Sequence, residues 1–312
     1  MSVVRAVQQT RGAGLGASLA AACLGVSPYM SPIGAWMQLK GWAQSMGGAP
    51  AEWGQILEPV VRGYYAAKHG FSVDGDSDRD ITVPTTSIYH PDLPWLRCTP
   101  DGIARELVTI GEDDVAGWPI ERTEWRQLHL VQVKTVDGRL RWHWGSSRAP
   151  TAPPHYRIQA VVEMAVTGLP RCDFAVLCGG NEYFEVIVER DADLEAAVLE
   201  SLTAFWSLVE RDEPPAIDGS DGWRSYFADR LPRDRQIVPA STEVEEAVAE
   251  WKRADEAARA AEDAANRSRN IIMRAASEDG ATAYETTIGR VSVIQPSGRL
   301  PYVKAPAEWA KE

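Results

Sequence analysis

The segment Leu128–Thr135 constrains the fold most, because it is an apolar run that carries a lysine near its end. The run is apolar enough to be the central strand of a sheet. Gln132 and Lys134 lie two residues apart, so their side chains face the same side of that strand. An unpaired charge at the end of a buried strand is unfavourable, and this predicts a functional role for Lys134.

Composition sets broad limits on the chain. Its 312 residues are 45% hydrophobic and include 12 Trp, which predicts one large domain or a core plus an appendage. The formal net charge of -12 argues against a basic nucleic-acid coat protein and against a membrane-surface protein. DNA binding remains compatible with this charge, because an enzyme can confine its positive side chains to a groove.

Cysteine usage and the first residues bear on the compartment. The four cysteines form no C-x-x-C pair, and Cys98 and Cys172 adjoin predicted strands, so we interpret them as reduced, structural thiols suited to a cytosol. The start of the chain lacks a signal-peptide apolar region, and no apolar run is long enough for a spanning helix. We therefore expect a cytoplasmic protein with no membrane partner.

Hydrophobic periodicity predicts alternating helices and strands. The predicted helices are 19–24 (capped by Gly16 or Ser18), 31–39, 50–68, 156–166 and 194–209, and the predicted strands are 128–135, 172–178 and 183–188. Residues 105–127 are polar and are interpreted as a variable insert. Glu58 falls near the middle of the helix at 50–68.

The C-terminal region is predicted to be separate from this core. Residues 1–211 form the predicted core, 212–240 a linker, and 241–312 an extension. A capping box, Thr242-x-x-Glu245, opens a long helix to about 276, and residues 282–294 are predicted to form a β-hairpin. We favour a helix and hairpin docked on the core; binding to a partner helix and a role in assembly are the alternatives.

Four short segments supply, in order, Glu58, Asp101, the pair Gln132 and Lys134, and Gln159. This order is typical of metal-dependent phosphodiester hydrolysis, which needs an activated water and charge relief on the leaving oxygen. Asp101 is the best metal ligand, the backbone carbonyl of Val133 is a neutral one, and Glu58 is placed to bind a second ion or a metal-bound water. Each residue alone has an ordinary explanation, such as a solvated helix face or a turn; only the joint pattern carries the prediction.

Over about residues 8–210 the chain resembles the phage lambda exonuclease and YqaJ-type viral recombinase family, within the PD-(D/E)xK nuclease superfamily. The motifs that carry this resemblance are Arg11-x-x-x-Leu15-Gly16-Ala17-Ser18, the run from Ala20 to Pro32, Trp36, Lys40-Gly41, Gly54-x-x-Leu57-Glu58-Pro59, Pro100-Asp101-Gly102, Val133-Lys134-Thr135, and Tyr156-x-x-Gln159 followed by Met164 to Gly168. Each motif is weak alone, and together, in order, they are strong.

The resemblance implies an α/β (α+β) fold of the restriction-endonuclease type, with a mixed central sheet flanked by helices. It does not extend to the long helix and β-hairpin, which are predicted from the sequence pattern as an appendage at the C-terminus. It implies Mg²⁺-dependent 5′→3′ digestion of one strand of linear duplex DNA, with Mn²⁺ as a substitute. It also implies a single-strand annealing protein as partner, a trimeric homo-oligomer, and a phage or prophage origin in a bacterial host.

The resemblance also assigns roles to residues. Glu58, Asp101 and position 132 are the implied metal ligands, Lys134 the catalytic lysine and Gln159 a helper. The implied substrate-binding residues are Arg11 and Ser18, which would hold a terminal 5′-phosphate, and Tyr156. A guanidinium, a hydroxyl and a helix N-terminus together suit an anion.

Gln132 departs from the family pattern, which has Glu or Asp there. An amide carbonyl can still bind Mg²⁺, but one negative charge is lost, so we expect weaker metal affinity or a higher metal requirement. The alternative from another class is a DNA-end-binding protein that has lost cleavage, and a third hypothesis is an endonuclease. The Arg139–Arg148 loop, with Trp142 and Trp144, is either a DNA contact or a partly buried loop held by its tryptophans.

Overall fold

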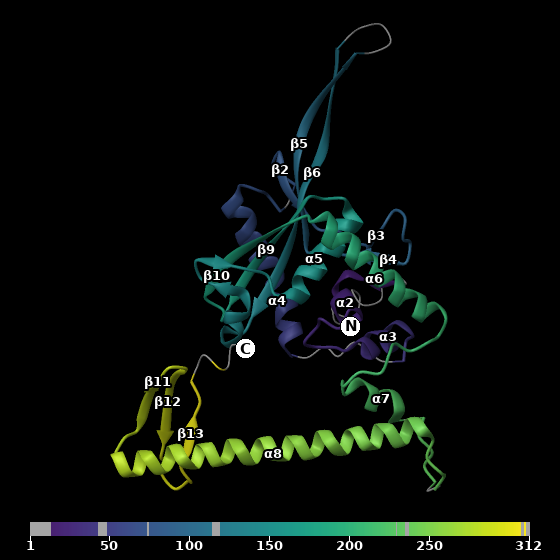
Figure 1. Ribbon diagram of the computed structural model, residues 1–312. Coiled ribbons are helices and arrows are strands. Elements are labelled where there is room, and N and C mark those ends of the chain that lie inside the picture. The colour runs from purple at the N-terminus through teal and green to yellow at the C-terminus, as the bar shows by residue number, and fades with distance from the viewer. Residues whose placement is uncertain are drawn as a thin grey trace. The chain divides into compact units, whose positions relative to one another are not determined.

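The strand predicted at 128–135 is the centre of a five-stranded mixed sheet (Figure 1). The computed structural model describes residues 14–42, 49–73, 75–113, 119–228, 230–234, 237–306 and 309. The chain divides into two compact units, Met1–Leu231 and Pro232–Glu312. The sheet belongs to the first unit, which is described first.

The sheet has the strand order β10-β9-β6-β5-β2. Its strands are β2 (Arg79–Thr82), β5 (Gly102–Asp113), β6 (Pro119–Val136), β9 (Arg171–Cys178) and β10 (Glu182–Glu189). Strands β6 and β9 run parallel, and the other neighbours are antiparallel. A parallel pair needs a crossover, and α5 (Pro154–Thr167) supplies it between β6 and β9.

Helices cover both faces of this sheet. The α5 side buries Leu130 and Phe174, whereas α4 (Ala49–His69) packs Val61 and Tyr65 against the opposite face (Figure 1). The other helices of the unit are α2 (Ala17–Cys23), α3 (Pro32–Leu39), α6 (Ala192–Glu210), α7 (Gly222–Ala228) and the 3-10 helix η1 (Gly138–Trp144). The predicted fold class, a mixed sheet flanked by helices, is confirmed.

Short strands fix the N-terminal segment and the loop near α5. A three-stranded sheet has the order β1-β4-β3, with β1 (Leu15–Gly16), β4 (Leu96–Cys98) and β3 (Ile88–Tyr89). A separate two-stranded sheet pairs β7 (Gly145–Ser146) with β8 (Ala149–Pro150). Gly14 has φ of 115° and lies against the backbone of Trp95, where a side chain would clash with the carbonyl oxygen. This close approach needs glycine and places β1 beside β4.

Three expectations about this unit differ from the structure. Residues 105–113 and 119–127, within the stretch interpreted as an insert, continue β5 and β6 as a two-stranded ribbon that extends from the sheet (Figure 1). Helical spacing puts Trp53, Ile56 and Val60 on the apolar face of the helix predicted at 50–68, but in α4 these three side chains are exposed. The segment predicted as a linker contains α7, whose Trp223 is buried.

The second unit consists of one long helix and a three-stranded sheet. Helix α8 (Thr242–Asp279) begins after Ser241, whose hydroxyl accepts a hydrogen bond from the Val244 amide, so the N-cap is one residue earlier than the predicted capping box. Strands β11 (Ala283–Thr286) and β12 (Gly289–Ile294) form the predicted hairpin, and β13 (Tyr302–Lys304) adds to β12. None of the helices in the described ranges is both long and apolar enough to cross a bilayer.

Candidate functional site

Asp101 lies where β5 separates from β6. The two strands pair from Gly102 opposite Val131 outward, so the edge of β6 beyond Val131 is no longer covered by β5. There the Asp101 Oδ2 atom accepts a 2.8 Å hydrogen bond from the backbone amide of Val133. Because the N–H and C=O of one strand residue project the same way, the Val133 carbonyl faces the same edge as Asp101. Two of the predicted metal ligands are therefore neighbours.

Gln132 is fully buried and connects the strand to α5. Its Oε1 atom accepts a 2.9 Å bond from the Lys134 Nζ atom and a 3.1 Å bond from the Gln159 Nε2 atom. The Lys134 ammonium also lies 5.2 Å from the centre of the Tyr156 ring. The residues predicted as the catalytic lysine, its strand neighbour and the helper on α5 thus form one connected group.

Glu58 approaches the site from α4, on the other face of the sheet. Its Oε1 atom accepts a 2.7 Å hydrogen bond from the Arg62 Nη1 atom, which also donates a 3.0 Å bond to the Asp101 backbone carbonyl. Partial burial and the Asp101 charge raise the pKa of Glu58, and the Arg62 pair opposes this rise. Sequence reasoning missed Arg62, although an oppositely charged pair four residues apart on a helix was a visible signal.

Sequence reasoning also missed Glu163, which is on α5 one turn after Gln159. Its side chain is almost completely buried, with 1% exposure, and its Oε1 atom accepts a 2.9 Å hydrogen bond from Gln159 Nε2. Burial, with a smaller effect of the Asp101 charge, raises the pKa of Glu163 to about 7 against the effects of Gln159 and Lys134. The signal was a single acid inside the apolar run from Ala160 to Val166.

The predicted substrate-binding residues are only partly described. Arg11 lies outside the described residues. Ser18 is exposed near the start of α2, whose N-cap is Gly16 without a side-chain cap. A side chain added at Gly16 would meet the Arg97 guanidinium at 3.9 Å, so a cation that sequence reasoning missed lies beside the start of this helix.

Tyr156 and the loop after β6 are held by aromatic contacts. Trp144 is buried and stacks on Tyr156 with ring centroids 5.4 Å apart. Arg141 pairs with Glu182, and Arg139 with Asp137. Trp142 remains exposed. Trp144 therefore belongs to the core, as the alternative of a partly buried loop expects, and Trp142 faces solvent. Contact of this loop with DNA stays a prediction.

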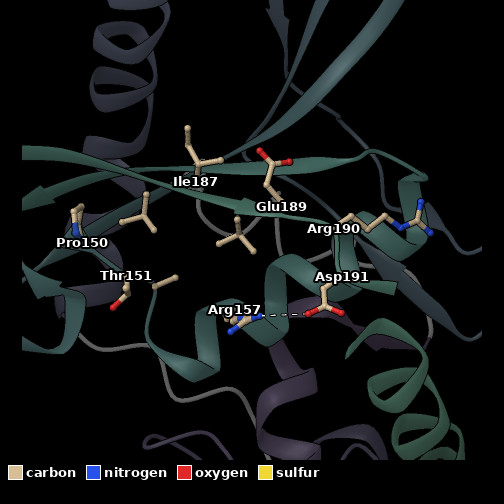
Figure 2. Close-up of a pocket in the computed structure, with 10 residues that line it drawn as sticks. Pro150, Thr151, Arg157, Ile187, Glu189, Arg190 and Asp191 are labelled. Carbon is tan, nitrogen blue, oxygen red and sulfur yellow. Dashed lines mark ion pairs between the residues drawn. The ribbon is translucent and has the colours of Figure 1, made fainter. Parts of the chain in front are cut away.

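One open pocket lies away from this cluster. It has a volume of about 530 Å³ and is lined by β10, the segment after β8 and the start of α5 (Figure 2). Its cations already have partners: Arg157 lies 3.7 Å from Asp191, and Arg190 pairs with Glu195. None of its lining residues is Asp101, Gln132, Lys134 or Glu58, so chemistry and not volume identifies the site.

The donor atoms of the cluster fit Mg²⁺, which prefers oxygen ligands and keeps several of its waters. The residues that would hold it are Asp101, through its carboxylate, and Val133, through its carbonyl, with Glu58 nearby. Across the described ranges, no group of three or more His, Cys, Asp or Glu side chains is arranged to hold a metal.

Comparison with known proteins gives one family and several distant relatives. The model of the YqaJ-like viral recombinase domain matches residues 7–170. The uncharacterized protein YqaJ of Bacillus subtilis is 23% identical over 223 residues, which span 70% of this chain and 60% of that protein.

Two solved structures are similar in fold. An alkaline exonuclease from Laribacter hongkongensis is 20% identical, with a TM-score of 0.49 over 73% of this chain and 100% of that one. A phage-related exonuclease from Haemophilus somnus is 11% identical, with a TM-score of 0.42 over 66% of this chain and 97% of that one. The family match covers more than half of the sequence and contains Glu58, Asp101, Lys134 and Gln159. This chain therefore belongs to the YqaJ-like viral recombinase family.

Proposed function

We propose that the protein is a Mg²⁺-dependent DNA exonuclease that digests linear duplex DNA 5′→3′ from a 5′-phosphorylated end. The observation that carries the proposal is the position of Asp101 against Val133, beside Lys134 at the uncovered edge of β6. Family membership supports the same activity. Mn²⁺ is the expected substitute for Mg²⁺.

In this proposal a bound Mg²⁺ provides an activated water and neutralises charge on the leaving oxygen. The Asp101 carboxylate has a fixed orientation in the site, because its Oδ2 atom accepts a hydrogen bond from the Val133 amide. Lys134 orients the attacking water through Nζ, which Gln132 and the Tyr156 ring hold in position. Gln159 holds the Gln132 carbonyl from α5.

The proposed pocket for the terminal phosphate is at the start of α2. Ser18 supplies a hydroxyl, Arg97 lies beside Gly16, and the resemblance adds Arg11. Such a pocket explains why only ends would be substrates. The strand left intact would pass to a single-strand annealing protein, and a trimer would keep the enzyme on its substrate; both belong to the proposal, as does action in the cytoplasm of a bacterial host.

The test is digestion of linear duplex DNA, with and without a 5′-phosphate, beside a covalently closed circle. The metal is varied as Mg²⁺, Mn²⁺ or EDTA. We expect loss of the linear form only, stimulated by the phosphate and stopped by EDTA. Digestion of the circle would instead identify an endonuclease, and cleavage in EDTA would contradict the metal requirement.

A second candidate function is DNA-end binding without cleavage. The observation that favours it is Gln132, which is neutral and whose Oε1 atom already accepts two hydrogen bonds. Under this alternative a folded wild-type protein binds ends in a mobility-shift assay but leaves the linear DNA intact with every metal.

A further inference from the structure

Glu163 is a buried carboxyl group connected to the candidate metal site. The Gln159 Nε2 atom donates to Oε1 of Glu163 at 2.9 Å and to Oε1 of Gln132 at 3.1 Å. Both acceptor oxygens therefore surround a single nitrogen atom. Gln132 in turn accepts from Lys134, so Glu163 is two hydrogen-bonded side chains from the proposed catalytic lysine.

Gln132 and Glu163 each have one buried polar atom without a hydrogen-bond partner. Neither Nε2 of Gln132 nor Oε2 of Glu163 has a hydrogen-bond partner within the part of the chain that the structure describes. An ionised carboxylate buried in this way is unfavourable unless a cation accompanies it, and none of the ion pairs formed by the described residues includes Glu163.

Charge counting shows what Glu163 adds. Around the site, the acids Asp101 and Glu58 are matched by the bases Lys134 and Arg62, and Arg62 is already paired with Glu58 at 2.7 Å. Without Glu163 the formal charges of these four side chains sum to zero, and a neutral site is a poor environment for a divalent cation. An acid at position 132 would make the sum negative, but Gln132 is neutral.

We propose that Glu163 is a carboxylate of the metal site and supplies the negative charge that position 132 lacks. The proposal rests on the metal-dependent function proposed above. It assigns the missing acid to α5 instead of β6, with Gln159 linking the two positions. Gln132 then acts chiefly as a hydrogen-bonding partner of Lys134.

The test measures Mn²⁺ binding to the full chain without DNA, by titration followed with electron paramagnetic resonance, at pH 8. Four proteins are compared: wild type, Glu163→Gln, Gln132→Glu, and the double variant Gln132→Glu/Glu163→Gln. Glu200→Gln is the control, because Glu200 is an exposed acid on α6 and its loss removes the same charge. Thermal melting in EDTA checks that each variant is folded.

Glu163→Gln should weaken Mn²⁺ binding about tenfold or more, while Glu200→Gln leaves it unchanged. The double variant should restore affinity to near the wild-type value, because it moves the carboxylate from position 163 to position 132. Unchanged affinity in a folded Glu163→Gln protein overturns the proposal, and so does a double variant that binds as weakly as Glu163→Gln.

Digestion of linear DNA in Mn²⁺ is measured in parallel to separate this inference from the proposed function. Wild-type binding that depends on Glu163, without any digestion, would support the inference and reject the nuclease. If the wild type digests DNA but Glu163→Gln binds Mn²⁺ as tightly as the wild type, the nuclease is supported and the inference about Glu163 is rejected. A wild type that binds no Mn²⁺ but digests DNA in EDTA would reject the inference and the metal requirement together.

Discussion

The carboxylate of Asp101 takes the place of a strand partner for Val133. Its Oδ2 atom accepts the Val133 amide at 2.8 Å, across 32 residues of sequence, at the point where β5 stops pairing with β6. This bond satisfies a backbone donor at an uncovered strand edge and fixes the orientation of the acid. The proposed principal metal ligand is thus held by the residue whose carbonyl is the proposed neutral ligand.

Replacement of Asp101 should abolish cleavage and leave DNA-end binding intact. Asp101→Asn keeps an oxygen that can accept the Val133 amide but removes the charge, so it tests the charge alone. We expect cleavage to fall at least about 100-fold, measured by digestion of linear duplex DNA, with fluorescence anisotropy of labelled ends unchanged. Asp92→Asn, at an exposed turn, is the control. Wild-type cleavage by Asp101→Asn would remove Asp101 from the proposed chemistry.

Gln132→Glu should preserve or raise activity at low Mg²⁺. The change adds an acid directly on β6, so the Mg²⁺ concentration for half-maximal digestion should fall. Gln127→Glu adds the same charge at an exposed position of the same strand and should have no such effect. Loss of activity in a folded Gln132→Glu protein would show that the role given to this position is wrong.

Lys134→Met should reduce the rate of cleavage about 100-fold or more, because it removes the group that orients the attacking water. The substitution keeps most of the length of the side chain but leaves Gln132 Oε1 without its 2.9 Å donor. Single-turnover digestion measures the rate, and Lys68→Met, whose lysine pairs with Glu185, is the control. Lys134→Met should still bind Mn²⁺; loss of metal binding would mean that Lys134 maintains the structure of the site instead.

Much of the site followed from the sequence, because its members lie at ends of regular elements. The strand pattern placed Gln132 and Lys134 on one face, and the turn at Asp101 came directly before a strand. The order of the four segments added Glu58 and Gln159, and the resemblance assigned their roles. The structure brings all five into one neighbourhood, linked by hydrogen bonds and by the charge of Asp101 on Glu58.

The rest depended on contacts that periodicity does not encode. Nothing local shows that one nitrogen of Gln159 would bind both Gln132 and Glu163, which lie on different elements. The ribbon of β5 and β6 was missed because its described side chains at 105–111 and 122–127 are half-buried or exposed, so no apolar alternation marks them. The helix predicted at 50–68 is present as α4, but only tertiary packing decides that Val61 is buried and Val60 exposed.

The pH dependence of stability should report the burial of Glu163 when metal is absent. Its pKa is raised from 4.5 to about 7, mainly by burial. The groups that influence it are Gln159, Lys134, Asp101 and Gln132. The folded protein therefore holds this proton more tightly than the unfolded chain does. The contribution of this proton to the free energy of unfolding is fully present below pH 4.5 and is lost as the pH rises through about 7.

The shift from 4.5 to about 7 corresponds to about 3 kcal/mol between the two pH limits. In EDTA at pH 8, Glu163→Gln should therefore melt roughly 5 °C or more above wild type, and at pH 4.5 the difference should nearly vanish. Glu200→Gln should show no such trend. Saturating Mn²⁺ at pH 8 should raise the melting temperature of wild type more than that of Glu163→Gln, because the cation compensates the buried charge only where that charge exists. Equal shifts in the two proteins would place Glu163 outside the metal's electrostatic reach.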